Sequence, residues 1–263
     1  MSVYNKENCE YFRDSLNSLF NQTLLPSEIV LVHDGPLTEK LYEVIESFKN
    51  KKIPIVELKF KENKGLGKAL SEGLKKCSFD LVGRMDTDDI AKYNRFEKQV
   101  NFLNNNINID LVSSWVGEFR NSIEDVISIR KVPETMTDII NFVKIRSPVN
   151  HPAVMFKKTS VLKAGNYQDF SFNEDYYLWM RMLAGGAQFY NIQENLLYFR
   201  ISEDVYKRRG GLQYCKKDIA LQKEMLKLGL VNTFEMYKNI LLRVPVRLIP
   251  NRMRKFIYNK FLR

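Results

Sequence analysis

The spacing of apolar residues along the first 90 positions alternates between helical and strand patterns. At positions 11–20 the apolar residues recur on one side of a helix, which predicts an amphipathic helix. The short β-branched run at 28–32 indicates a buried parallel strand, and it ends at the turn-forming residues 33–36. By the same criteria we expect helices over 38–50 and 65–76 and strands over 53–60 and 80–85.

Strand, helix and strand at these spacings make βαβ units, which build a mostly parallel, Rossmann-like sheet with helices on its faces. The sequence therefore predicts an α/β fold. In open sheets of this kind, ligands bind beyond the C-terminal ends of the strands. Asp34 and Asp86 each follow one of the expected strands. We therefore expect their carboxylates in one crevice.

Beyond Asp89 the pattern is less regular, and no repeat or low-complexity linker divides the chain. We interpret residues 1–205 as one α/β domain and residues 206–263 as a basic helical C-terminal extension. Pro245 and Pro250 are expected to break the end of the chain into short pieces. The other elements expected here are helices over 95–104, 176–183 and 211–228 and a strand over 110–119.

The composition is that of one globular domain with an appendage. The chain has 263 residues, of which 44% are hydrophobic. No apolar run reaches the length of a transmembrane helix, and the first residues lack the apolar stretch of a signal peptide. The three cysteines follow no zinc-binding or disulfide pattern, which fits free thiols in a reducing compartment. We therefore expect a cytoplasmic protein.

Positive charge is concentrated near the C-terminus. The net charge is +10, and the residues from Lys207 onward include fifteen Lys or Arg and three Asp or Glu. This distribution suits either a polyanionic partner or a plain solvated surface. From Tyr237 onward, apolar residues alternate with cations, which is typical of a helix on an anionic membrane surface; a helix packed on the domain is the alternative. No nucleic-acid recognition motif precedes it, so no nucleic-acid partner is expected.

The densest group of acids directly follows the strand expected over 80–85. Asp86, Asp88 and Asp89 place three carboxylates within four positions, and their repulsion is costly unless a cation or several donors lie between them. Oxygen ligands at this density suit Mg²⁺ or Mn²⁺, which bind through one or two carboxylates and substrate phosphates. The alternative is that Asp88 or Asp89 caps a following helix, and Asp89 is the expected cap.

Five short motifs occur in order along the chain. They are Ser2-Val3-Tyr4-Asn5, the strand 28–32 with His33-Asp34-Gly35, Asn63-Lys64-Gly65, Arg84-Met85-Asp86-Thr87-Asp88-Asp89, and Glu174-Asp175 with Leu178-Trp179 and Arg181. Together they resemble glycosyltransferase family 2 on a GT-A fold, in particular the bacterial capsule and exopolysaccharide transferases. The resemblance covers about residues 1–200 and implies sugar transfer from a nucleotide-sugar donor.

On the donor side, the resemblance implies a role for each matching residue. Ser2 and Tyr4 would lie beside the nucleotide base, and Asp34 would accept a hydrogen bond from it. Asp86 would contact the ribose, and Lys64 would also belong to the nucleotide site. On the residues alone, Tyr4 can equally be a core residue and Asp34 a turn residue.

The resemblance also implies the metal and acceptor residues. Asp88 would hold Mn²⁺ or Mg²⁺ on the diphosphate, and Asp175 would be the general base, although a lone acid there can also cap the helix expected at 176. His151 would contact the acceptor or the metal, with an orienting structural role as the alternative. Arg208 and Arg209 would bind the diphosphate from a closing loop, or be plain surface charge.

The sequence departs from the family pattern at two places. His33 stands where many relatives have an Asp, and Met1-Ser2-Val3 stands where they have a longer first strand, so we expect a shortened strand beside Tyr4. Arg200 is expected on the same loop as Arg208.

These observations predict an inverting, metal-dependent glycosyltransferase with a UDP-sugar donor. By the resemblance, the acceptor is a lipid-linked glycan in bacterial surface polysaccharide synthesis, and the enzyme is peripheral on the inner face of the cell membrane. The enzymatic rival is a sugar-phosphate nucleotidyltransferase, which requires a Gly-rich basic loop where this chain has residues 5–8. A non-catalytic membrane-surface scaffold is the other alternative.

Overall fold

The computed structural model describes residues 1–170, 173–201 and 211–249. Its helices are α1 (Cys9–Phe20), α2 (Glu39–Lys49), α3 (Leu66–Lys76), α4 (Arg95–Asn105), α5 (Met136–Val143), α6 (Lys158–Lys163), α7 (Glu174–Ala184), α8 (Leu212–Lys227), α9 (Thr233–Leu248) and the 3-10 turn η1 (His151–Ala153). Its strands are β1 (Ser2–Val3), β2 (Ile29–His33), β3 (Ile55–Lys59), β4 (Leu81–Gly83), β5 (Ile90–Ala91), β6 (Leu111–Phe119), β7 (Ser128–Arg130), β8 (Met155–Lys157) and β9 (Phe189–Arg200).

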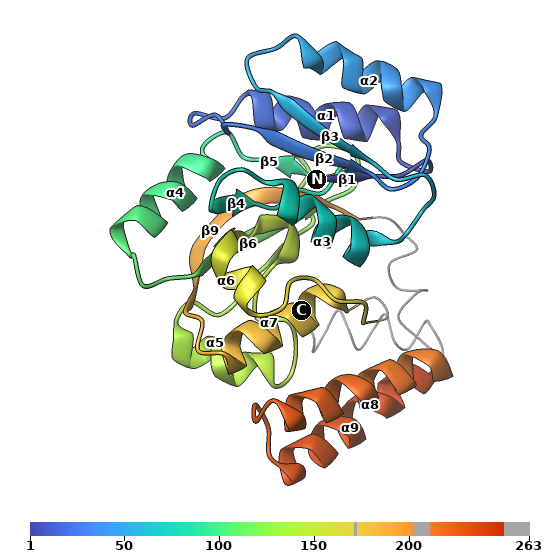
Figure 1. Cartoon of the computed structure of the whole chain (residues 1–263). Helices are drawn as coiled ribbons and strands as arrows, with labels where there is room; N and C mark the ends of the chain where they lie inside the picture. The colour runs from blue at the N-terminus through green and yellow to red at the C-terminus, as the bar shows by residue number, and fades with distance from the viewer. Residues whose placement is uncertain (171–172, 202–210, 250–263) are drawn as a thin grey trace.

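The first three strands form a parallel sheet in the order β1-β2-β3 (Figure 1). Every residue of β2 is buried, which explains its uninterrupted apolar run. Helices α1 and α2 cover one face of this sheet and α3 the other (Figure 1). Leu31 of β2 packs in one core cluster with α1 and α2, whereas Leu70 and Leu74 of α3 belong to a second cluster. The predicted βαβ arrangement is confirmed for this half.

The second sheet has strands of both directions, in the order β4-β8-β6-β9-β5, with β7 paired to β6. The long strands β6 and β9 run parallel, whereas the other described pairs are antiparallel. The parallel arrangement expected from the sequence therefore does not extend to this sheet. Strands β5, β7 and β8 have only two or three residues each, too few to show a recognisable alternation in the sequence.

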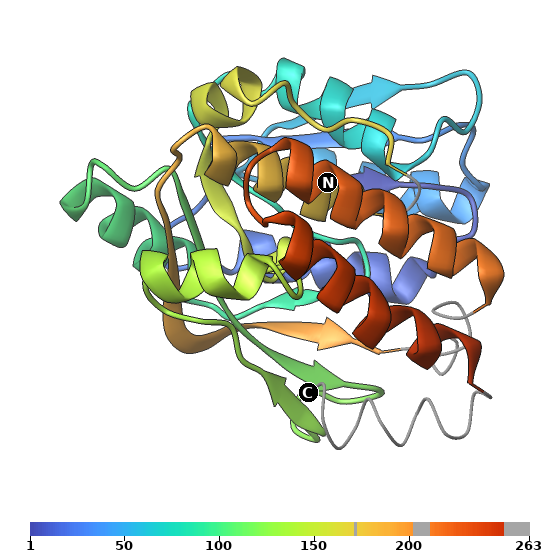
Figure 2. The ribbon, with the colours of Figure 1, turned by 90° about the horizontal axis from the view of Figure 1, so that it is seen from below.

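The C-terminal helices form an antiparallel hairpin that packs on the rest of the fold (Figure 2). Leu221 and Met225 of α8 and Met236 of α9 lie in the same core cluster as Trp179 of α7. The expectation that Pro245 ends a short piece is wrong, because α9 continues through it to Leu248. Its start is fixed by a capping box, which the sequence reading missed.

That capping box joins Asn232 and Glu235, each side chain bonding the other residue's backbone N–H. Inside the hairpin, Asp218 binds Arg243 Nη2 at 2.9 Å and Arg247 Nε at 2.7 Å. These contacts hold α9 against α8. Residues 250–263 of the proposed basic extension lie outside the described residues, and the boundary at 205/206 stays a prediction. Among the described helices, none is both long and apolar enough to span a bilayer.

Candidate active site

The predicted acidic motif forms the connection between β4 and β5, and hydrogen bonds from two other segments hold it. Ser15 Oγ of α1 donates to the carbonyl oxygen of Asp86 at 2.7 Å. Thr87 Oγ1 donates to the Glu7 carboxylate, which belongs to the loop after β1. The acids are therefore fixed relative to α1 and to the N-terminal loop.

Asp86 is an anion beside a buried cation. Its carboxylate forms an ion pair with the Arg84 guanidinium, whose side chain is only 5% exposed. Burial alone would raise the pKa of Asp86, but the charge of Arg84 holds that pKa below its ordinary value. An ionised carboxylate can accept hydrogen bonds from hydroxyl groups, which is the chemistry of the predicted ribose contact.

Asp88 is in the opposite electrostatic situation. Burial, together with repulsion from Asp86 and Glu7, raises the pKa of Asp88 to about 7. A divalent cation would relieve this repulsion, and oxygen ligands are those that Mg²⁺ and Mn²⁺ prefer. The described residues contain no cluster of three or more His, Cys, Asp or Glu that could enclose an ion. The residues fit the open mode of binding, with one or two carboxylates and substrate phosphates as ligands.

Asp89 does not cap a helix, because the residues that follow it form strand β5. Its side chain is fully buried, and Oδ1 accepts a hydrogen bond from the backbone N–H of Arg200 at 2.9 Å. Burial, with repulsion from Asp86 and Asp88, raises the pKa of Asp89 well above its ordinary value. The cap prediction is therefore wrong, and Asp89 instead joins the acidic motif to the end of β9.

Arg200 is the last residue of β9 and is buried, not on a loop as expected. Its Nε donates to the carbonyl oxygen of Asp88 at 3.0 Å, and its guanidinium lies over the ring of Tyr11 at 3.8 Å and that of Phe119 at 4.5 Å. Arg200 therefore holds the backbone of the acidic motif in place. Arg208 and Arg209 lie outside the described residues, so their role stays a prediction.

Asp34 directly follows β2, and its carboxylate binds the loop before α3. Oδ1 accepts from Lys64 N at 2.6 Å and Oδ2 from Gly65 N at 3.1 Å. Gly35 has φ of +91°, and a Cβ there would lie 2.9 Å from Asn63 N, so this close approach requires glycine. The carboxylate therefore has the turn role that was the alternative, and its remaining lone pairs can still accept a base N–H. The Lys64 side chain is exposed.

The remaining donor-side residues lie at the ends of β1 and β2. Ser2 pairs with Val32, and Tyr4 follows β1 with 42% of its side chain exposed, so Tyr4 is not a core residue. His33 is buried, with Nε2 3.0 Å from Glu57 Oε2. Burial lowers the pKa of His33. The His33 side chain therefore contacts β3, and Asp34 supplies the carboxylate at the end of β2.

On the acceptor side, Asp175 lies in the first turn of α7, two positions after the capping residue Asn173. The alternative that Asp175 is the cap is therefore wrong. Burial raises the pKa of Asp175 above its ordinary value, although nearby backbone N–H groups oppose this. His151 Nδ1 lies 3.9 Å from Asp175 Oδ2, and its Nε2 lies 3.1 Å from Tyr167 Oη.

The Arg84 charge connects these two parts of the site. Burial, followed by the positive charge of Arg84, lowers the pKa of His151 to about 3. The imidazole is therefore neutral near pH 7. The same charge lowers the pKa of Asp86 and partly opposes the rise that burial causes in the pKa of Asp175, so the acid after β4 and the acid in α7 lie in the field of one cation.

The structure thus brings Asp86, Asp88, His151 and Asp175 into one electrostatic neighbourhood, and Asp34 lies at the end of β2 in the other sheet. Sequence reasoning missed the contributions of Glu7, Arg84 and Tyr167. Arg84 is the first residue of the acidic motif, and Glu7 lies in the loop after the first strand. Tyr167 carried no signal, because its contact with His151 spans sixteen positions and depends on the tertiary fold.

Solved structures with this arrangement are GT-A glycosyltransferases. S. aureus TarS 1-349 in complex with UDP-GlcNAc superimposes with a TM-score of 0.68 at 17% identity, over 94% of this chain and 71% of that one. Against a longer TarS crystal structure, the chain spans 42% of that protein. At this identity the likeness shows the fold, and the GT-A prediction is confirmed.

The sequence comparisons define the family. Residues 1–162 match the model of glycosyl transferase family 2, and the chain belongs to this family. It is 38% identical over its full length, and over 95% of the relative, to an Escherichia coli UDP-Gal:alpha-D-GlcNAc-diphosphoundecaprenol beta-1,3-galactosyltransferase. It is 36% identical, over 99% of the chain and 97% of the relative, to the Erwinia amylovora amylovoran biosynthesis glycosyltransferase AmsE. The protein is therefore a glycosyltransferase rather than a nucleotidyltransferase or a scaffold.

Proposed function

We propose that this glycosyltransferase is inverting and metal-dependent, and that it transfers a sugar from a UDP-sugar to a hydroxyl of a lipid-linked glycan in bacterial surface polysaccharide synthesis. One observation carries the proposal. The repelling carboxylates of Asp86, Asp88 and Glu7 gather where a cation and a diphosphate would be bound, and Asp175, with its raised pKa, shares the field of Arg84 with them.

Asp88 would hold a divalent ion, as enzymes of this family generally use one. When bound, Mn²⁺ or Mg²⁺ would neutralise the charge that develops on the leaving diphosphate. The chain itself orients the donor. Asp86 would accept from the ribose hydroxyls, and Asp34 from the base, with Tyr4 and Ser2 beside the base and the Lys64 side chain near the same edge.

Asp175 would act as the general base. As the acceptor oxygen attacks the anomeric carbon, its proton passes to the Asp175 carboxylate, and the bond from the anomeric carbon to the diphosphate oxygen breaks. One base opposite the leaving group implies in-line displacement with inversion. The raised pKa of Asp175 supports this role, because a stronger base accepts the proton more readily. Neutral His151 would orient the acceptor beside it, and Arg208 and Arg209 would bind the diphosphate.

The choice of donor and acceptor rests on the relatives. The Escherichia coli relative bears UDP-Gal and a diphosphoundecaprenol acceptor in its name, and the Erwinia relative takes part in amylovoran biosynthesis. Because both match almost the whole chain, we infer a UDP-sugar and a lipid-linked acceptor here as well.

A membrane location is supported by the outer face of α9. Phe234, Tyr237, Leu241 and Leu248 recur at helical spacing and are each more than half exposed, while Arg247 faces the core. An apolar stripe of this size on a surface helix is typical of a membrane-interface or protein-contact surface. With a lipid-linked acceptor, we propose an anionic membrane, which places the protein in the cytoplasm on the inner face of the cell membrane.

Donor hydrolysis without acceptor tests the catalytic proposal. Wild-type protein with a panel of UDP- and GDP-sugars should release nucleotide diphosphate in a Mn²⁺- or Mg²⁺-dependent manner, with the UDP donors preferred. Asp88→Asn should reduce the rate at least ~10²-fold, since one group that stabilises transition-state charge is lost. The matched control is Asp125→Asn, an exposed carboxylate on the β6–β7 turn. Equal activity of Asp88→Asn and wild type would refute the metal assignment.

Vesicle flotation tests the membrane proposal. Leu241→Glu with Leu248→Glu should abolish binding to vesicles that contain phosphatidylglycerol, while Ile107→Glu, an equally exposed apolar position outside the hairpin, should not. If the double variant still binds, the α9 face is not the membrane surface. If it instead changes the oligomeric state in gel filtration, a second copy covers the stripe.

A further inference from the structure

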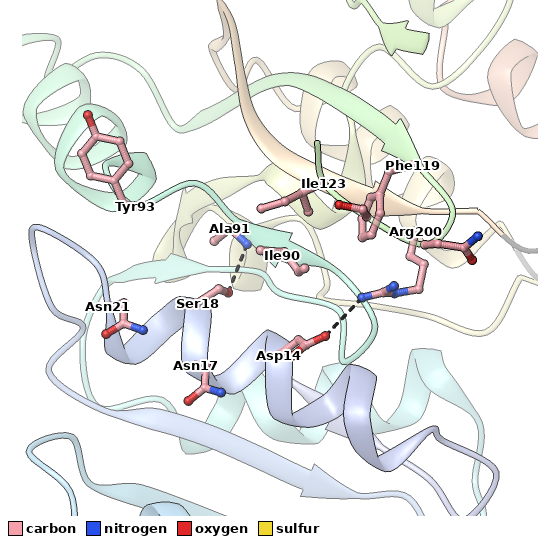
Figure 3. A pocket seen from close by; sticks show the side chains of 12 residues that line it. Asp14, Asn17, Ser18, Asn21, Ile90, Ala91, Tyr93, Phe119, Ile123 and Arg200 are labelled. Carbon is pink, nitrogen blue, oxygen red and sulfur yellow. Dashed lines mark hydrogen bonds and ion pairs between the residues drawn. The ribbon is translucent and has the colours of Figure 1, made fainter. Parts of the chain in front are cut away.

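A groove lies between α1, β5 and the turn after β6 (Figure 3). Its volume is about 420 Å³, within the usual ~300–1,000 Å³ range of small-molecule sites. None of the residues that line it is a predicted donor or base residue. Its floor includes Arg200, whose Nε binds the backbone of Asp88.

Three amide side chains that line the groove are not used by the fold. Asn17 lies on α1, Asn21 is the C-terminal cap of that helix, and Asn121 lies on the turn after β6. Among the described residues, no side-chain hydrogen bond involves any of these three amides. Each amide offers two donors and an acceptor oxygen, so the groove provides both kinds of partner at once.

The groove also has apolar lining residues. The Tyr93 side chain is 66% exposed at the edge of the groove, and Ile123 and Phe119 also line it (Figure 3). Adjacent amide and aromatic groups suit a ligand with hydroxyls around its rim and C–H groups on its faces. A pyranose has this shape and chemistry.

The charges disfavour an anionic ligand. Among the described lining residues, Arg200 is the only cation, and its guanidinium already binds the Asp88 carbonyl oxygen, the Arg120 carbonyl oxygen and the Asp14 carboxylate, the last at 3.6 Å. Asp14 itself adds an exposed negative charge to the groove. A phosphate or nucleotide would be repelled by Asp14 and would find no free cation among the described lining residues, whereas a neutral sugar needs none.

We propose that this groove binds a neutral pyranose of the acceptor glycan, at a subsite separate from the donor and base residues. The inference rests on the proposed function for the identity of the glycan. Arg200 joins the groove to the Asp88 backbone, so an occupied groove and a bound donor stabilise the same segment of chain. The subsite would hold a longer acceptor more tightly than its terminal sugar alone.

Saturation-transfer NMR on the full chain tests this subsite. The probes are galactose, N-acetylglucosamine, lactose and chitobiose, with UDP and diamagnetic Mg²⁺ in excess so that the donor site is filled. At least one saccharide should bind wild-type protein, and Asn17→Ala with Asn121→Ala should weaken that binding about tenfold, the effect of losing two net hydrogen bonds. Asn104→Ala, an exposed amide on α4, is the matched control.

The outcomes separate the two proposals. Donor hydrolysis by the Asn17/Asn121 variant should stay within twofold of wild type, because neither residue touches the donor. The subsite is wrong if no saccharide binds, if binding survives the double substitution, if Asn104→Ala weakens it equally, or if inorganic phosphate displaces the sugar. If saccharides bind as expected but wild-type protein hydrolyses no nucleotide-sugar, the groove stands and the proposed catalytic function fails.

Discussion

The two halves of the proposed active site hold their carboxylates differently. On the donor side, Asp34 accepts two backbone N–H groups and Asp86 is paired with the buried Arg84. On the acceptor side, Asp175 lies 3.9 Å from a neutral imidazole, and burial raises its pKa. Asp34 and Asp86 are therefore satisfied anions, whereas Asp175 is a carboxylate that lacks a close cation.

This difference matches the chemistry of each half. A carboxylate held by backbone N–H groups or by Arg84 stays ionised and keeps one geometry, which suits the recognition of hydroxyl and N–H groups. A carboxylate with a raised pKa binds a proton more strongly, which suits a base. Substitutions of Asp34 and Asp86 should therefore change binding and stability, and substitution of Asp175 should change the rate of the chemical step.

The largest effect is expected for Asp175→Asn. An amide cannot take the acceptor proton, so kcat should fall by ~10²–10⁴-fold while the donor KM stays within a few-fold of wild type. Steady-state kinetics with saturating acceptor measures both constants. The matched control is Glu39→Gln, which also changes an acid in the first turn of a helix. A rise in donor KM with unchanged kcat would assign Asp175 to the donor half and break the comparison.

Asp34→Asn should act on binding and folding instead. One of the two backbone donors at Lys64 and Gly65 would face an amide NH₂ and lose its acceptor, which costs ~1–3 kcal/mol of unfolding free energy. Urea denaturation measures that loss, and the donor KM should rise about tenfold with kcat little changed. Asp125→Asn serves again as the control, because its carboxylate is exposed. Wild-type stability in Asp34→Asn would mean that these bonds contribute nothing.

The pH dependence of kcat separates the halves without any substitution. A general base must be deprotonated, so activity is lost as pH falls through its folded pKa. Because burial raises the pKa of Asp175, the acid limb of kcat should lie above the usual carboxylate range of about 4. Rates from pH 4 to 9, with metal and donor kept saturating, check this. An acid limb at or below pH 4 would contradict the assignment of Asp175 as a base in this environment.

The sequence predicted the secondary structure correctly where local patterns determine it. The strand β2 and the helices α1 to α3 lie within one or two residues of the predicted bounds, because their apolar periodicity and the capping residue Thr38 are local signals. Asp34 and Asp86 follow β2 and β4 as predicted, while their sharing of one crevice stays a prediction. The role of Asp89 could not be predicted in this way, because its hydrogen-bond partner is the backbone of Arg200, 111 positions away.

Two further errors have the same cause. Arg200 was expected on a loop because nothing near it in the sequence signals that it is the last residue of a long strand. Nor does the sequence show that its guanidinium lies over the rings of Tyr11 and Phe119. Pro245 was expected to end a helix because a proline removes a backbone donor, yet contacts made by Arg243 and Arg247 with Asp218 hold that helix in place. The structure at such positions depends on contacts between residues that are far apart in the sequence, and a single sequence does not reveal those contacts.

The smallest effect, and the sharpest test of the comparison, is expected for His151→Asn. Burial and the charge of Arg84 lower the pKa of His151 to about 3, so the ring carries no charge that could shift Asp175. Its loss should cost at most about tenfold in kcat, the size of one net hydrogen bond. The acid limb of the kcat profile should not move. If His151 were instead charged in the working enzyme, it would lower the pKa of Asp175, and its removal would shift that limb to higher pH. Such a shift would mean that the acceptor half, like the donor half, holds its carboxylate with a cation.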